Sequence, residues 1–177
     1  MLTVLLGGAR SGKSALAVEI ATQGGNAVTY LATSPTILGD DDLAGRIARH
    51  RAERPSTWTT IEEQLDLAGA IARVATPVVI VDCLTVWAGS MLHHGHDERA
   101  VLDASAAAIA VVADRELVAV VVSNEVGLGI VPVNELARQY RDVLGRVNQQ
   151  WVASADHALL MVAGRALPLY EPHELLR

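Results

Sequence analysis

Short apolar runs recur along the chain and alternate with longer segments in which apolar residues return every three or four positions. The short runs are nearly continuous, without a regular apolar–polar alternation, which is typical of strands buried on both faces of a sheet. Strands are therefore predicted at Leu2–Leu6, Ala27–Leu31, Val78–Asp82, Leu117–Val122 and Ala158–Val162.

The segments between these runs carry the periodicity of helices. Helices are predicted at Lys13–Gln23, Asp41–Arg54, Glu63–Val74, Leu84–His93, Glu98–Asp114 and Val133–Ser154. Strands that alternate with helices indicate βαβ units, which form a mainly parallel sheet with helices on both faces. The pattern predicts an α/β fold in a single domain over residues 1–177, with no interpretation for the tail at 166–177.

Composition and charge argue against some classes of partner and location. The net charge of −6 argues against nucleic acid as a partner, because phosphate backbones attract clustered Lys and Arg. No apolar run approaches the length needed to span a membrane, so we expect no stable membrane insertion. Cys83 is the only cysteine, and the first residues lack the basic region of a signal peptide, so a cytoplasmic protein without disulfides is predicted.

Residues 7–14 read GGARSGKS and match the pattern G-x-x-x-x-G-K-[ST]. The pattern is typical of a P-loop, in which backbone N–H groups surround phosphates, the lysine contacts the β- and γ-phosphates, and the final hydroxyl binds Mg²⁺. Its position between a predicted strand and a predicted helix is the one a P-loop requires. The motif favours a P-loop NTPase-like fold over a glycine-rich turn with no nucleotide.

Polar or small residues follow four of the predicted strands. They are Gly7–Ser14, Ala32–Ser34, Asp82–Cys83 and Ser123–Glu125. In a parallel sheet these clusters open onto one edge, where ligands bind. Asp82 is interpreted as the acid that orients Mg²⁺ through water, with a simple strand-end cap as the alternative.

The segment RIARHRAERP at 46–55 is rich in arginine and contains His50. One interpretation is a solvated amphipathic helix with internal ion pairs. The other is a phosphate-handling helix in which a neutral His50 attacks phosphorus. For His93-His94-Gly95-His96, a loop between two helices is favoured over a metal-binding tract.

Taken together, the ordered motifs resemble one family. GGARSGKS, YLATS at 30–34, RIARHRAERP, Trp58 to Glu62, SNEVGLGIVP at 123–132 and RDVLGRVNQ at 141–149 look like the bifunctional adenosylcobinamide kinase / adenosylcobinamide-phosphate guanylyltransferase of cobalamin biosynthesis. The resemblance covers about residues 1–165. It departs at the strand-end acid, Asp82, where some relatives carry glutamate, and the HHGH segment matches no family motif.

The resemblance implies two reactions at one site. ATP or GTP phosphorylates adenosylcobinamide, and GMP is then transferred from GTP to adenosylcobinamide phosphate through a histidine–GMP intermediate, with release of pyrophosphate. It implies His50 as the nucleophile, Lys13 as a catalytic residue, Mg²⁺ held by Ser14 and Asp82, and a homotrimer. The implied nucleotide contacts are Gly7, Gly8, Ala9, Arg10, Ser11, Gly12, Lys13, Ser14, Thr33, Ser34, Arg51, Ala52, Glu53, Arg54, Glu62 and Asp82.

Two other functions remain alternatives at this stage. A monofunctional P-loop kinase would transfer a γ-phosphate and form no covalent GMP adduct. A GTP-binding regulatory module would bind nucleotide with negligible turnover.

Overall fold

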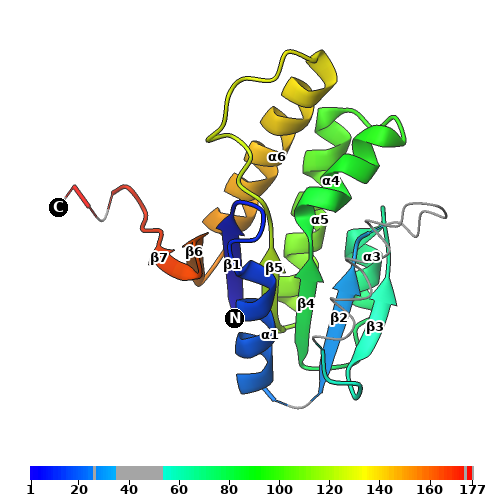
Figure 1. The fold of residues 1–177 in the computed structure, drawn as a ribbon. Coiled ribbons are helices and arrows are strands. Elements are labelled where there is room, and N and C mark those ends of the chain that lie inside the picture. Colours follow the sequence, from blue (N-terminus) through cyan, green and yellow to red (C-terminus); the bar gives the residue numbers. More distant parts are fainter. Residues whose placement is uncertain (26, 35–53, 174, 177) are drawn as a thin grey trace.

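A computed structural model describes residues 1–25, 27–34, 54–173 and 175–176 (Figure 1). Seven strands form one sheet in the order β3-β2-β4-β5-β1-β6-β7. Every neighbouring pair is parallel except β6 and β7, which are antiparallel. The strands are β1 (Leu2–Gly7), β2 (Val28–Ala32), β3 (Thr59–Glu62), β4 (Val78–Asp82), β5 (Val118–Val122), β6 (His157–Val162) and β7 (Arg165–Pro168).

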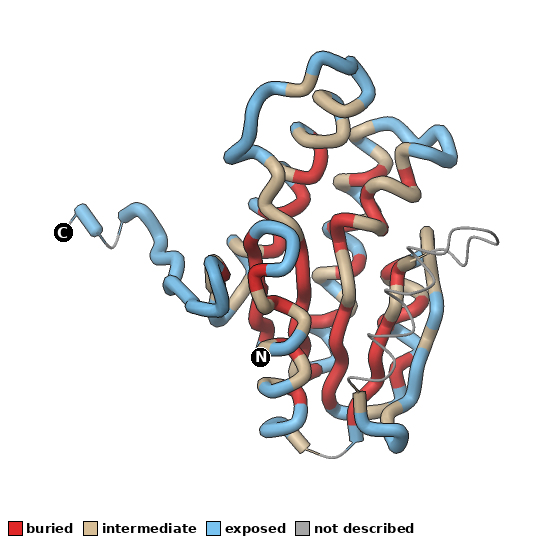
Figure 2. The backbone as a smooth tube through the Cα atoms, in the orientation of Figure 1, coloured by how far each residue is buried: buried red, intermediate tan, exposed pale blue. Residues whose placement is uncertain are grey.

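The described helices lie on both faces of this sheet, as Figure 1 shows. They are α1 (Lys13–Gln23), α3 (Leu67–Ala72), α4 (Leu84–His93), α5 (Glu98–Asp114) and α6 (Glu135–Ala153). Successive residues of β4 point to opposite faces: Val79 and Val81 join the core formed with α3 to α6, and Val78 and Ile80 join the core formed with α1. The central strands are therefore buried on both faces, and the α/β prediction is confirmed (Figure 2).

Two predicted helices begin later than the sequence pattern indicates. The helix predicted at Glu63–Val74 spans Leu67–Ala72. It begins after Asp66, whose side chain accepts from the N–H of Gly69 at 2.9 Å, and the Glu63 carboxylate accepts from the N–H groups of Leu65 and Asp66 before it. The helix predicted at Val133–Ser154 begins at Glu135, where the Asn134 side chain accepts a hydrogen bond from the N–H of Ala137 at 3.1 Å. Side-chain caps compete with further helical turns in this way.

Two strands were not predicted. β3 pairs with β2, and β7 folds back on β6, so the first part of the uninterpreted tail is an edge strand. The predicted helix at Asp41–Arg54 lies outside the described residues up to position 53. Within the described part of the chain, no helix combines the length and apolar character that crossing a bilayer requires.

Candidate functional site

The loop between β1 and α1 has the backbone that its glycines allow. Gly7 has φ +148°, and Gly12, directly before α1, has φ +100°, both in regions that side chains disfavour. Arg10 also has positive φ, at +58°. The N–H of Gly164, in the β6–β7 turn, donates to the carbonyl of Ser11 at 3.0 Å. The loop is thus held in place by the neighbouring hairpin, and α1 begins directly beneath it, as phosphate binding requires.

Lys13 turns back into this loop. Its Nζ donates to the carbonyls of Gly7 at 2.8 Å and Gly8 at 2.7 Å, and to Ser11 Oγ at 3.3 Å. The residue is only 6% exposed, and burial lowers the pKa of its ammonium group from the ordinary lysine value. A buried ammonium gains strongly from an anionic partner, so the loop is suited to phosphate oxygens.

Asp82, at the end of β4, faces the first turn of α1. Its Oδ2 accepts a hydrogen bond from Ser14 Oγ at 3.3 Å and another from the Tyr30 hydroxyl. The two predicted magnesium residues are therefore adjacent. Hydroxyl and carboxylate oxygens fit Mg²⁺, which is commonly held by one or two protein oxygens together with phosphates and water.

Tyr30 and Arg54 extend this cluster. The Arg54 guanidinium carbon lies 3.5 Å from the centre of the Tyr30 ring, a cation–π contact. Burial, followed by the negative charge of Asp82, raises the pKa of Tyr30 well above its ordinary value. The phenol therefore stays protonated and serves Asp82 as a permanent hydrogen-bond donor.

Thr33 joins the ends of β2 and β4. It is fully buried; its Oγ1 donates to the carbonyl of Cys83 at 2.7 Å and accepts from the N–H of Cys83 at 2.8 Å. Its own N–H donates to the carbonyl of Asp82 at 3.1 Å. These bonds fix the backbone that presents the Asp82 carboxylate. Ser34 follows, and its buried Oγ has no hydrogen-bond partner in the described structure.

The structure brings together most of the predicted nucleotide contacts that it describes. Gly7–Ser14, Thr33, Ser34 and Asp82 surround the ends of β1, β2 and β4, and Arg54 reaches them through Tyr30. Glu62 ends β3 at the same edge, beyond β2. His50, Arg51, Ala52 and Glu53 lie outside the described residues.

Comparison with known proteins identifies the family. The model for "Cobinamide kinase / cobinamide phosphate guanyltransferase" matches residues 3–169. The chain belongs to this family. It is 40% identical over 172 residues to the bifunctional adenosylcobalamin biosynthesis protein CobP of Pseudomonas aeruginosa, covering 96% of this chain and 97% of the relative. It is 39% identical over 178 residues to CobU of Escherichia coli, covering 93% of this chain and 97% of the relative.

The fold has a more distant relative of known structure. The RadB recombinase superposes with a TM-score of 0.50 and 16% identity, over 90% of this chain and 73% of that chain. At that identity the similarity supports the α/β fold alone. The sequence prediction of the cobinamide kinase / guanyltransferase family is thus confirmed by sequence relatives of nearly equal length.

Two residues of the site were missed by sequence reasoning. Tyr30 belongs to the YLATS motif but had no role assigned; the one signal was a phenol in a mostly apolar strand. Glu125 lies in a cluster recognised after β5 and likewise had no role. Its N–H donates to the carbonyl of Gly7 at 3.1 Å, so the NEVG segment at 124–127 contacts the P-loop directly.

The HHGH segment is a helix end and turn, in agreement with the favoured interpretation. His93 and His94 form the end of α4, and Gly95 has φ +84°. His94 Nδ1 lies 2.8 Å from the carbonyl of Ser90. Among the described residues, no group of three or more His, Cys, Asp or Glu side chains could hold a metal ion.

Proposed function

We propose that this chain phosphorylates adenosylcobinamide with ATP or GTP, and then transfers GMP from GTP to adenosylcobinamide phosphate, giving adenosylcobinamide-GDP and pyrophosphate. One observation carries the proposal: Lys13, Ser14 and Asp82 converge at the mouth of a P-loop in a chain that matches the family over residues 3–169. The domain would act as a single nucleotide-binding unit.

Each described residue has a task in the kinase step. The loop N–H groups and the Lys13 ammonium would hold the β- and γ-phosphates and neutralise charge that develops on the leaving group. Ser14 and Asp82 would hold Mg²⁺, which when bound supplies further charge neutralisation across the phosphates. Tyr30 and Thr33 would keep the Asp82 carboxylate in place.

In the guanylyl transfer, His50 would attack the α-phosphorus of GTP. The bond to pyrophosphate breaks as the bond from the imidazole nitrogen forms, and the substrate phosphate later displaces the histidine. Arg51, Ala52, Glu53 and Arg54 would bind nucleotide beside it, with Glu62, Thr33 and Ser34 at the same edge. Arg54 supports this role, because its guanidinium stacks on Tyr30, whose hydroxyl donates to Asp82.

A labelling experiment tests this function. Incubation with Mg²⁺ and GTP labelled in the α-phosphate should give a protein adduct that survives alkali and is lost in acid, as a phosphoramidate is. His50→Ala should abolish the adduct, and His96→Ala, which alters an exposed histidine in a turn, should retain it. Adduct formation on His50→Ala would contradict the assignment. Phosphorylation without any adduct would support a monofunctional kinase, and binding without turnover would support a regulatory module.

We also propose a cytoplasmic homotrimer. The loop after β5 exposes several large apolar side chains, with Leu128 at 81%, Ile130 at 98% and Val133 at 97% exposure, and such patches are typical of subunit interfaces. Sedimentation equilibrium should report three times the mass of the 18.7 kDa chain. Ile130→Asp should lower that mass, and a monomeric wild-type protein would refute the trimer.

A further inference from the structure

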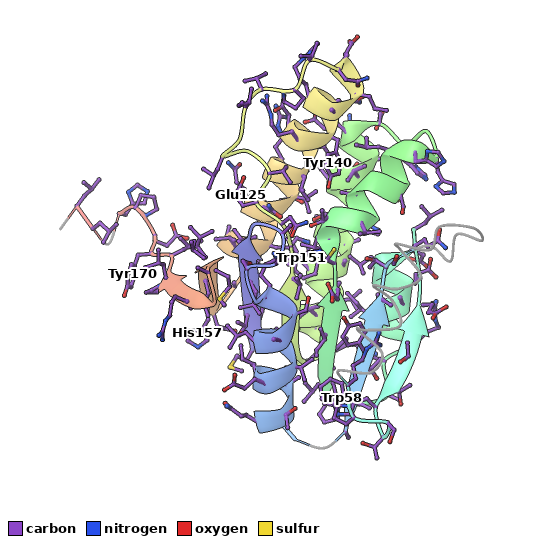
Figure 3. The ribbon with its side chains drawn as sticks, in the orientation of Figure 1. Trp58, Glu125, Tyr140, Trp151, His157 and Tyr170 are labelled. Carbon is purple, nitrogen blue, oxygen red and sulfur yellow. The ribbon has the colours of Figure 1, made fainter. Side chains whose placement is uncertain are left out.

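Glu125 is attached to the P-loop by its own backbone. The N–H of Ser123 donates to the carbonyl of Leu5 at 3.0 Å, and the N–H of Glu125 donates to the carbonyl of Gly7 at 3.1 Å. The Gly7 carbonyl also accepts from Lys13 Nζ at 2.8 Å. Figure 3 shows Glu125 on the segment that leaves β5, beside the loop between β1 and α1. One carbonyl thus connects the lysine of the phosphate site to the backbone of Glu125.

The residues before Glu125 are also held by hydrogen bonds to side chains of α4 and α6. The N–H of Asn124 donates to Thr85 Oγ1 of α4 at 2.6 Å. The buried Asn148 of α6 donates through Nδ2 to the carbonyl of Asn124 at 3.1 Å. Three elements therefore fix the start of this segment, and a functional group on it has the rigid support that a catalytic position needs.

Glu125 lies beside the P-loop, on the segment that leaves β5 at the carboxyl edge of the sheet. β5 lies directly beside β1, whereas Glu62 ends β3, which is separated from β1 by β2, β4 and β5. Asp82 already accepts from Ser14 and Tyr30. On the other flank of β1, β6 passes into β7 through Ala163 and Gly164, which carry no acid. Asp156 lies at the opposite, amino-terminal end of β1, where its Oδ2 accepts from the N–H of Leu2 at 2.7 Å. Among the described residues, Glu125 is the carboxylate beside the carboxyl end of β1 to which no magnesium or nucleotide role is assigned.

We propose that Glu125 is the general base of the kinase step, an inference that rests on the proposed function. Its carboxylate accepts the proton of the adenosylcobinamide hydroxyl as that oxygen forms a bond to the γ-phosphorus. The bond between the γ-phosphorus and the β–γ bridging oxygen breaks, and its electron pair leaves on the nucleoside diphosphate. Lys13 Nζ and the Glu125 N–H both donate to the Gly7 carbonyl, so both residues adjoin the loop that would hold the phosphates. The guanylyl transfer needs no such base, because its acceptor is already a phosphate anion.

A conservative variant separates proton transfer from loop structure. Glu125 Oε1 accepts a hydrogen bond from the N–H of Gly127 at 2.6 Å, which shapes the turn that follows. Glutamine keeps an oxygen acceptor at this position, so Glu125→Gln preserves the turn and removes the base. Glu125→Ala removes both the base and the acceptor for the Gly127 N–H. A purely structural role predicts that the glutamine variant works normally and that the alanine variant does not.

The experiment measures both reactions on the same preparations of full-length protein. For Glu125→Gln we expect the kcat of adenosylcobinamide phosphorylation to fall by about 100-fold or more, the usual range for loss of a general base. The KM for the phosphate donor and the amount of His50-linked GMP should stay within about twofold of wild type, because neither depends on the base. Glu125→Ala should lose phosphorylation to at least the same extent.

Three results would overturn the assignment. The first is a Glu125→Gln variant that phosphorylates adenosylcobinamide within about threefold of wild type. The second is a parallel loss of GMP labelling and phosphorylation, which would indicate damage to the shared nucleotide site. In both cases the wild-type protein still phosphorylates adenosylcobinamide, so the proposed function stands. The third is a wild-type protein that does not phosphorylate adenosylcobinamide, and this result would refute the proposed function as well.

Discussion

Replacing Lys13 with alanine is expected to lower kcat/KM for adenosylcobinamide phosphorylation by about 100-fold to 1000-fold, the usual effect of removing one donor from a preorganised anion site. Three donor contacts hold the ammonium inside the loop, at the Gly7 and Gly8 carbonyls and Ser11 Oγ. The same protons can be donated to phosphate oxygens where charge develops. Initial rates measured over a range of nucleotide and adenosylcobinamide concentrations give the change in kcat/KM.

Thermal unfolding separates this loss from misfolding. Without nucleotide, Lys13→Ala should unfold close to wild type, because the lysine is costly to bury and the Gly7 carbonyl keeps its bond from the Glu125 N–H at 3.1 Å. The stabilisation by Mg²⁺ and GTP should be lost. Arg99→Ala, which removes a cation that is 90% exposed, should leave both rate and stabilisation unchanged. Near-normal catalysis by Lys13→Ala would contradict the assignment of the loop as the phosphate site.

The five strands predicted from sequence are the five interior strands of the sheet. β1, β4 and β5 lie in the middle of the sheet, where both faces are covered, so nearly all of their residues are apolar and the runs stand out. β3 and β7 are the two edge strands. Thr59, Thr60 and Glu62 are exposed, as are all four residues of β7, so neither strand has an apolar run. Both form because a neighbouring strand offers hydrogen-bonding partners, which is information that local sequence does not carry.

Some residues of the candidate site could likewise be predicted from the sequence, and others could not. A local motif predicted Gly7–Ser14, because each residue of a P-loop has a task that depends on its immediate neighbours. The convergence of Asp82 on Ser14 followed from the rule that parallel strands end at one edge. The contact of Tyr30 with Asp82 depends on the register between β2 and β4, which pairs Ala32 with Asp82. The position of Glu125 depends on β5 lying next to β1. Neither neighbour relation can be obtained from spacing along the chain.

Replacing Gly7 with alanine is expected to destabilise the folded protein by about 3 kcal/mol, the sum of backbone strain and overpacking, each worth about 1–3 kcal/mol. Gly7 has φ +148°, which side chains disfavour, and a Cβ there would lie 2.4 Å from the Met161 carbonyl oxygen. That oxygen belongs to the backbone of β6, which pairs with β1 at this position and has little freedom to move. The melting temperature should fall by roughly 6–12 °C in calorimetry.

Gly8→Ala is the matched control, because a Cβ at Gly8 would meet no atom within 4 Å. Its stability without nucleotide should stay within about 0.5 kcal/mol of wild type, as for most exposed substitutions. Equal stabilities of the two variants would show that β1 and β6 can separate at the P-loop. The predicted difference would instead mean that the close approach of Gly7 to Met161 determines where the loop leaves the sheet. The positions of the Gly7 carbonyl, the Lys13 ammonium and the Glu125 backbone all follow from that point.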